Sequence, residues 1–263
     1  MGVLNVTPDS FSDGGKFRAV DDALRHVAKM LEDGAAIIDV GGESTRPGAA
    51  AVGEAEELQR VIPIIEHIRA RFDVPISVDT STPAVMAEAA AAGAALINDV
   101  RALRRPDAMA TAANTSAAIC LMHMQGEPAT MQSEPQYVDP VTEIHDFLEA
   151  RVAAAVAAGI DRTRLLVDPG FGFGKRLAHN LALLAQLPRI GALGLPVLIG
   201  LSRKSMLGAL TGRDVHDRLA GGIAATALAL QGGACIVRAH DVAATVDAAR
   251  VVAAVREASG DCS

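Results

Sequence analysis

Apolar runs of strand length alternate along this chain with alanine-rich segments of helix length. The predicted strands are residues 3–6, 37–40, 76–78, 96–97, 118–122, 165–167, 197–200 and 235–237. The predicted helices are 20–33, 54–71, two that begin near 83 and 106, 139–158, 177–187, 216–231 and 241–258. Strands and helices in this alternation predict an α/β protein with a parallel sheet. Because there are eight such units, we expect a closed (βα)8 TIM barrel rather than an open sheet.

Polar or charged side chains stand just past the end of every predicted strand. They are Asn5 with Thr7, Pro8 and Asp9; Asp39 with Glu43, Ser44, Thr45 and Arg46; Asp79; Asn98 and Asp99; His123; Asp168; Ser202, Arg203 and Lys204; and Arg238 with His240. In a barrel these strand ends share one face, which is where barrel enzymes have their active sites. One or two of these residues, such as Asp39 or Asp99, can equally be caps or turn formers. A polar residue at all eight ends indicates a site.

The stretch 165–175, LLVDPGFGFGK, places Asp168 between a buried strand and a run of alternating glycines. A carboxylate there either binds a donor on a ligand or accepts from its own loop. The glycines fit neither of two common phosphate-binding motifs. Lys175 stands where the dinucleotide fingerprint needs a glycine, and Pro169 and Arg176 break the P-loop pattern. His123, between two methionines, is as consistent with a packed residue as with a ligand.

The composition indicates one domain with a large core. The chain has 263 residues, of which 50% are hydrophobic and 3% aromatic. A single barrel of this length is ordinary, so we expect one domain over residues 1–263. The three cysteines form no CxxC pair, which suggests neither a disulfide framework nor a zinc site. Since there is no signal peptide and no long apolar run, we expect a soluble cytoplasmic protein without a membrane partner.

The charge of the chain narrows the ligand class. The formal net charge of -7 argues against a nucleic-acid partner. Cations nevertheless gather at the predicted strand ends, namely Arg46, Arg203, Lys204, Arg238 and His240. We therefore expect an anionic small-molecule substrate. No GxSxG motif is present, so covalent hydrolysis is disfavoured.

Eight segments carry motifs that can be compared with known families. They are GVLNVTPDSFSDGG (2–15), IIDVGGESTRPGA (37–49), SVDTS (77–81), INDV (97–100), LMHMQG (121–126), LLVDPGFGFGK (165–175), GLSRKSMLG (200–208) and RAHDV (238–242). In this order, and over nearly the whole chain, they resemble bacterial dihydropteroate synthase. The resemblance implies a TIM barrel of the pterin-binding type. That family usually begins with a short segment, often a hairpin, which we expect this chain to lack, with more consequence for stability than for chemistry.

The resemblance implies a reaction in folate biosynthesis. 6-Hydroxymethyl-7,8-dihydropterin pyrophosphate condenses with 4-aminobenzoate to give 7,8-dihydropteroate and pyrophosphate, and sulfonamides inhibit by mimicking aminobenzoate. A pterin edge carries adjacent N–H donors and a carbonyl acceptor. Asp168 would pair with the donors, Asp79 and Asn98 would complete the hydrogen bonds, and Lys204 would meet the carbonyl.

The resemblance also assigns the leaving group and the second substrate. Asn5, Arg238 and His240 would hold the pyrophosphate, with Mg²⁺ carried by the diphosphate and touched by Asn5. The loops 7–15 and 42–49 would act as lids. Thr45 and Arg46 would close over the site. The aminobenzoate ring would lie against Phe11, Pro47, Phe173 and the stem of Lys204, and Ser205 would hold its carboxylate with help from a helix N-terminus.

The implied chemistry is a dissociative substitution in which pyrophosphate departs first. Arg238, His240, Lys204 and Arg46 would be the catalytic residues, because they stabilise departing charge and position the reactants. The family also implies a homodimer. Two alternatives stay open: a methyltetrahydrofolate:corrinoid methyltransferase, which needs no diphosphate site, and a pterin-binding protein that has lost activity.

Overall fold

The computed structural model describes residues 1–6, 16–43, 52–127 and 130–260. Parallel strands alternate with helices throughout. The strands are β1 (Gly2–Asn5), β2 (Ile38–Gly41), β3 (Ile76–Asp79), β4 (Leu96–Asp99), β5 (Ala118–Met122), β6 (Leu165–Asp168), β7 (Leu198–Ile199) and β8 (Ile236–Val237). The helices are α1 (Lys16–Glu32), α2 (Glu54–Arg71), α3 (Pro83–Ala91), α4 (Ala108–Ala113), α5 (Pro140–Ala157), α6 (Leu177–Ala185), α7 (Leu187–Gly191), α8 (Ser205–Thr211), α9 (Leu219–Gln231) and α10 (Val242–Ser259).

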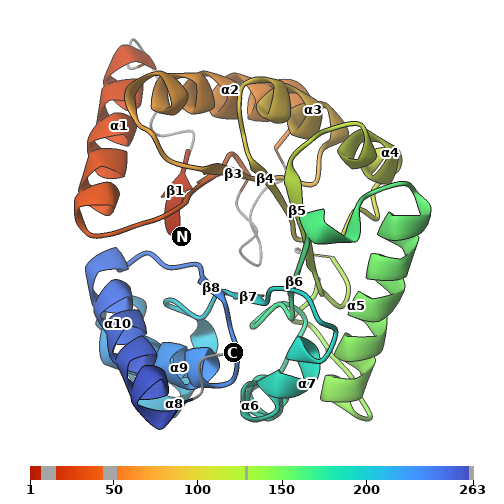
Figure 1. Ribbon diagram of the computed structural model, residues 1–263, viewed down its shortest axis with the longest axis vertical. Coiled ribbons are helices and arrows are strands. Elements are labelled where there is room, and N and C mark those ends of the chain that lie inside the picture. The colour runs from red at the N-terminus through yellow and green to blue at the C-terminus, as the bar shows by residue number, and fades with distance from the viewer. Residues whose placement is uncertain (7–15, 44–51, 128–129, 261–263) are drawn as a thin grey trace.

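The strands form a closed ring. β1 to β6 pair in sequence order, and β7 pairs with β8. Single bridges join the two sheets at both junctions, between Val167 and Val197 and between Gly2 and Ala239. At the second junction the Ala239 N–H donates to the Met1 carbonyl at 3.0 Å. Figure 1 shows the helices surrounding this ring. The prediction of a (βα)8 barrel is confirmed.

Three details of the predicted helices were wrong. The segment 177–187 is divided into α6 and α7, because Pro188 lies in the first turn of α7 and has no N–H to continue α6. The segment 216–231 begins as a short 3-10 turn, Val215–Asp217, and its α-helix starts only at Leu219. The apolar pattern did not indicate the short helix α8, which follows β7; only the resemblance implied a helix N-terminus at Ser205.

Successive side chains along each strand point alternately into two apolar cores. One face of the strands packs against the helices, as Ile97 and Val167 do. The other face fills the barrel with a cluster that includes Leu96, Cys120 and Leu166. Because side chains alternate between faces, residues two positions beyond Leu96 and Leu166 also face the interior, and these are Asn98 and Asp168. The barrel interior therefore has polar groups at the carboxyl ends of the strands. They lie above the cluster that includes Leu96, Cys120 and Leu166, which we call the apolar plug.

Within the described ranges, none of the helices combines the length and the apolar character that crossing a membrane requires.

Candidate active site

Neighbouring strands bring Asn5, Asp79 and Asn98 into one layer at the mouth of the barrel. The register aligns Asn5 with Gly41, Gly41 with Asp79, and Asp79 with Asn98. A Cβ at Gly41 would lie 3.9 Å from the Asn5 Oδ1 and 3.7 Å from the Asp79 Oδ2. Two side-chain oxygens therefore lie on either side of Gly41, and Asn5 is exposed there. Hard oxygen donors of this kind suit Mg²⁺.

Arg238 crosses from the end of β8 to two carboxylates on β2 and β3. Its Nε–H donates to the Asp39 Oδ2 at 2.6 Å, and its Nη2 donates to the Asp79 Oδ2 at 2.9 Å. Burial works to lower the pKa of Arg238, but Asp39 and Asp79 outweigh it and raise that pKa. Burial raises the pKa of Asp79 to about 7, and the Arg238 charge opposes this rise. Arg238 is therefore a permanent cation held by one edge of its guanidinium.

Asp39, whose role the sequence left undecided, is the buried partner of Arg238. Its side chain is completely buried and bonds to Arg238, which stands 199 positions later in the chain. Its Oδ1 has no hydrogen-bond partner among the described residues. The signal for its role was an aspartate in the middle of an otherwise apolar strand, since such a carboxylate requires a buried partner. Asp99, by contrast, is a turn former: it accepts from Ser81 and from the N–H groups of Arg101 and Leu103.

Asp168 and Lys204 carry opposite charges, and burial makes the charged form of each side chain less favourable. Asp168 is 5% exposed, and its Oδ1 accepts the Gly170 N–H at 2.7 Å. Burial raises the pKa of Asp168 to about 6 against the opposing effects of that hydrogen bond and of Lys204. Burial, followed by the Arg238 charge, lowers the pKa of Lys204 to about 8. The Lys204 Nζ lies 4.1 Å from the centroid of the Phe173 ring, so these two predicted residues are in contact.

The alternating glycines serve close backbone packing. Gly170, Gly172 and Gly174 all have positive φ, of 69°, 79° and 60°. A Cβ at Gly170 would overlap the His123 carbonyl oxygen, and one at Gly174 would overlap the Gln125 carbonyl oxygen. These positions therefore need glycine both for backbone conformation and for space.

Lys175 fixes this loop from within, which the sequence analysis missed. Its Nζ donates to the carbonyls of Gly170 at 2.8 Å and Phe173 at 3.0 Å, and lies 2.9 Å from the His123 Nδ1. Burial, followed by the Lys175 charge, lowers the pKa of His123 to about 2, so the imidazole is neutral and accepts the hydrogen bond. His123 is consequently a packed residue, and Lys175 anchors the loop that carries Phe173.

The remaining predicted residues in the described ranges lie at the same mouth. Asn98 is 4% exposed, and its Oδ1 has no partner among the described residues, so it offers a buried polar atom to a ligand. The His240 Nδ1 lies 3.1 Å from the Ser202 Oγ. Ser205 is the exposed first residue of α8. Four predicted residues, Phe11, Thr45, Arg46 and Pro47, lie outside the described residues.

These features define a class of protein: a barrel enzyme whose C-terminal face presents buried carboxylates and an amide to a polar ligand, with cations alongside. Residues 1–240 match the model of the pterin binding enzyme family. The dihydropteroate synthase of Escherichia coli (strain K12) is 53% identical over 258 residues, which are 98% of this chain and 92% of the relative. The chain belongs to the dihydropteroate synthase family, and it is thus a transferase of folate biosynthesis.

Two solved structures agree with this assignment. The dihydropteroate synthase of Yersinia pestis in complex with a sulfonamide drug has a TM-score of 0.93 and 53% identity, and the match covers 98% of this chain and 94% of that one. The enzyme from Xanthomonas albilineans in complex with 7,8-dihydropteroate has a TM-score of 0.87 and 52% identity, covering 97% and 92%. Neither the methyltransferase nor the inactive pterin-binding protein is favoured by these relatives.

Proposed function

We propose that this chain joins 6-hydroxymethyl-7,8-dihydropterin pyrophosphate to 4-aminobenzoate at the mouth of its barrel, and that Asp168, Asn98 and Asp79 hold the pterin. The main support is the burial of these three polar side chains on top of the apolar plug. Buried carboxylates and amides need partners, and the N–H donors of a pterin edge supply them in a fixed pattern. Lys204, opposite Asp168 in charge, meets the pterin carbonyl.

Arg238 and His240 bind the pyrophosphate. The Nε and Nη2 of Arg238 are engaged by Asp39 and Asp79, whereas within the described part of the chain no hydrogen bond reaches its Nη1. This leaves the outer end of the guanidinium to face a phosphate oxygen. As the carbon–oxygen bond breaks, negative charge grows on the pyrophosphate, and a cation already held in place stabilises it without reorganisation. The electron-rich dihydropterin stabilises the methylene cation, so pyrophosphate leaves before the aniline nitrogen attacks.

Mg²⁺ is the proposed cofactor, carried by the diphosphate. The exposed Asn5 side chain would touch it beside Gly41, where the Asp79 carboxylate adds negative charge. Magnesium commonly binds phosphates with few protein ligands, so one amide oxygen is sufficient. When bound, the ion neutralises part of the pyrophosphate charge.

The aminobenzoate side is formed by Phe173, the stem of Lys204 and Ser205. Phe173 and Lys204 already pack together and offer an apolar wall, while Ser205 offers a hydroxyl at the start of α8. The proposed aminobenzoate site also includes four residues that lie outside the described ranges: Phe11, Thr45, Arg46 and Pro47. Since sulfonamides mimic aminobenzoate, and the Yersinia pestis relative is seen with one, we expect sulfonamides to inhibit this chain.

A homodimer is proposed from the surface of α9 and α10. Large apolar side chains stay exposed there, among them Leu228 at 62%, Val251 at 63% and Val255 at 56%. Val251 and Val255 are one helical turn apart and share a face. Apolar side chains grouped on adjacent helices are suited to covering by a second copy. A cytoplasmic location and the absence of a nucleic-acid partner stay predictions.

The direct test is pyrophosphate release by the purified protein with the pterin pyrophosphate and Mg²⁺, with and without 4-aminobenzoate. We expect release that needs both substrates and yields dihydropteroate. Arg238→Ala should lower kcat by about two orders of magnitude or more and should weaken pterin binding far less, because Arg238 acts on the leaving group and reaches the pterin only through Asp79. Arg250→Ala, on the exposed surface of α10, is the control. An Arg238→Ala enzyme within a few-fold of the parent would rule out the leaving-group role.

A further inference from the structure

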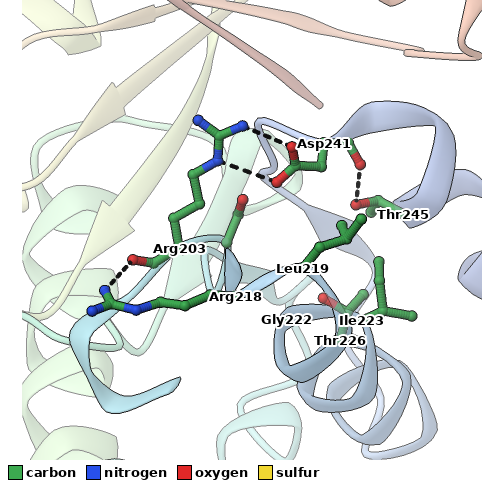
Figure 2. A pocket seen from close by; sticks show the side chains of 9 residues that line it. Arg203, Arg218, Leu219, Gly222, Ile223, Thr226, Asp241 and Thr245 are labelled. Carbon is green, nitrogen blue, oxygen red and sulfur yellow. Dashed lines mark hydrogen bonds and ion pairs between the residues drawn. The ribbon is translucent and has the colours of Figure 1, made fainter. Parts of the chain in front are cut away.

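Two loops of the site are joined by side chains that neither the reaction nor the family comparison assigns a role. Arg203 follows β7, and Asp241 follows β8. The Arg203 Nε donates to the Asp241 Oδ2 at 3.2 Å, and its Nη2 donates to the Asp241 Oδ1 at 2.7 Å, which makes a two-pronged ion pair (Figure 2). Beside it, the His240 N–H donates to the Ser202 Oγ at 3.2 Å. The loops that carry Lys204 and His240 are thereby tied together.

The backbone at Arg203 is in a conformation that favours glycine. Its φ is +62°, in the left-handed region, and it directly precedes Lys204. A non-glycine residue stays in this region only when its surroundings hold it there. The ion pair with Asp241 provides one such constraint, because it fixes the direction of the Arg203 side chain.

Arg218, just before α9, holds the same turn from the other side. Its Nη1 donates to the Arg203 carbonyl at 3.1 Å (Figure 2). The same Nη1 donates to the Lys204 carbonyl at 3.4 Å. It reaches them across Gly208 of α8, where any Cβ would overlap the Arg218 guanidinium. Both peptide groups that flank Lys204 are therefore held by an arginine that does not face the pterin residues.

We propose that Arg203, Asp241 and Arg218 are positioning residues, which set the loop of Lys204 and Ser205 against the loop of Arg238 and His240. The inference rests on the proposed function, in which the first loop contacts aminobenzoate and the second holds pyrophosphate. The aniline nitrogen must already lie close to the pterin methylene carbon when pyrophosphate departs, because the cation formed there has to be captured before water or pyrophosphate reacts with it. A shift of about 1 Å between the loops would misalign the nitrogen and this carbon and cost roughly 100-fold in rate.

The ion pair is well suited to this role because it can be broken without burying an unpaired charge. The Arg203 and Asp241 side chains are 37% and 31% exposed, so water replaces either partner. The Asp241 carboxylate also raises the pKa of Arg203, mainly through their hydrogen bonds, which keeps the bridge ionised. Its loss should thus change geometry more than stability.

The test compares Arg203→Met, Asp241→Asn and the double variant. We expect each single variant to lower kcat at least ten-fold and to raise the KM for aminobenzoate. The thermal midpoint should stay at the parent value, because the pair is partly exposed. The pterin Kd should change much less than kcat, because Asp168, Asp79 and Asn98 lie on other strands and only Lys204 is displaced. The double variant should be no worse than the worse single variant, since both remove one interaction. Arg250→Met, which breaks the exposed pair with Asp247 at 3.7 Å, is the matched control.

The outcomes separate the inference from the proposed function. An active parent with single variants within two-fold of it overturns the positioning role, and so does a loss of activity that follows a fall in thermal midpoint. Additive losses in the double variant also overturn it, because they show two independent contributions. A parent that binds pterin but releases no pyrophosphate overturns the proposed function instead.

Discussion

At the scale of single residues, burial brings ionisable groups of the site into the neutral pH range. Asp168 and Lys204 are both desolvated by the barrel, and their pKa values move toward each other, to about 6 and about 8. Each group is charged in water at pH 7 in any case, but inside the barrel each is only one to two pH units from losing its charge. The site therefore responds to modest changes in pH.

Pterin affinity should be highest between pH 6 and pH 8. Below about pH 6 the Asp168 carboxyl is protonated and no longer accepts two N–H donors, and above about pH 8 Lys204 is neutral and no longer binds the carbonyl as a cation. Calorimetry of pterin binding from pH 5 to pH 9 measures this profile. Asp168→Asn should weaken binding by roughly 1–3 kcal/mol and should leave only the part of the acid limb that Asp79, with its pKa of about 7, contributes. The exposed Asp146→Asn is the control. A pterin affinity that stayed constant from pH 5 to pH 9 would contradict the proposed protonation changes of both Asp168 and Lys204.

Lys175→Met should destabilise the protein. The change leaves buried acceptors at Gly170, Phe173 and His123 without their donor, and each unsatisfied group costs about 1–3 kcal/mol. The free energy of unfolding in denaturant is the measurement. Lys29→Met, at an exposed position of α1, is the control and should leave it nearly unchanged. Equal effects at the two positions would mean that Lys175 does not anchor the loop.

At the scale of elements, the loop between β6 and α6 decides how Phe173 and Asp168 are presented. Gly172 is tied through its N–H to the Asn180 Oδ1 at 2.8 Å, and Tyr137 donates to the Gly174 carbonyl at 2.8 Å. Positive φ at three glycines lets the backbone turn tightly against the loop after β5. A rigid loop of this kind keeps the site organised before substrate binds.

Gly170→Ala and Gly212→Ala separate backbone strain from steric overlap. Both glycines have nearly the same φ, +69° and +68°, but a Cβ at Gly212 would meet nothing within 4 Å among the described residues. Gly212→Ala should cost about 1–2 kcal/mol of unfolding free energy from conformation alone. Gly170→Ala should cost clearly more and should also weaken pterin binding, because its Cβ displaces the His123 carbonyl. Denaturant titration of both variants is the measurement, and equal losses would show that the predicted overlap does not occur.

At the scale of the whole molecule, closure of the barrel makes the site. Bridges at Val167–Val197 and Gly2–Ala239 join the ends of the two sheets. Only when β8 lies beside β1 does Arg238 reach Asp39 and Asp79, which lie 199 and 159 positions away in the chain. Figure 1 shows α10 next to α1, on the outside of this second junction.

Leu228→Glu should weaken the proposed homodimer. A charge in an apolar interface loses its hydration without gaining a partner. Sedimentation of the parent should give twice the 27.1 kDa mass of the chain, and the variant should shift toward that single mass. Leu181→Glu on α6, where the leucine is also partly exposed, is the control and should sediment like the parent. A parent that sediments at 27.1 kDa at all concentrations would exclude the dimer.

The sequence by itself determined the eight strand–helix units and the residues at the strand ends. Alternating apolar segments are a local property, and strand periodicity already places Asp168 and Asn98 at the carboxyl ends of buried strands. The motifs around these ends were long enough to identify the family before any geometry was known. Boundaries were less certain, as the division at Pro188 shows, because a single proline interrupts an otherwise helical pattern.

The tertiary structure alone decided which of these polar residues are partners. Asp39 with Arg238, Lys175 with His123 and Arg203 with Asp241 are separated by 199, 52 and 38 positions. No local pattern encodes such pairs, because they form only when closure of the barrel brings distant strand ends within hydrogen-bond distance. Burial, which moves the pKa values of Asp168 and Lys204, likewise depends on how the whole chain packs around them.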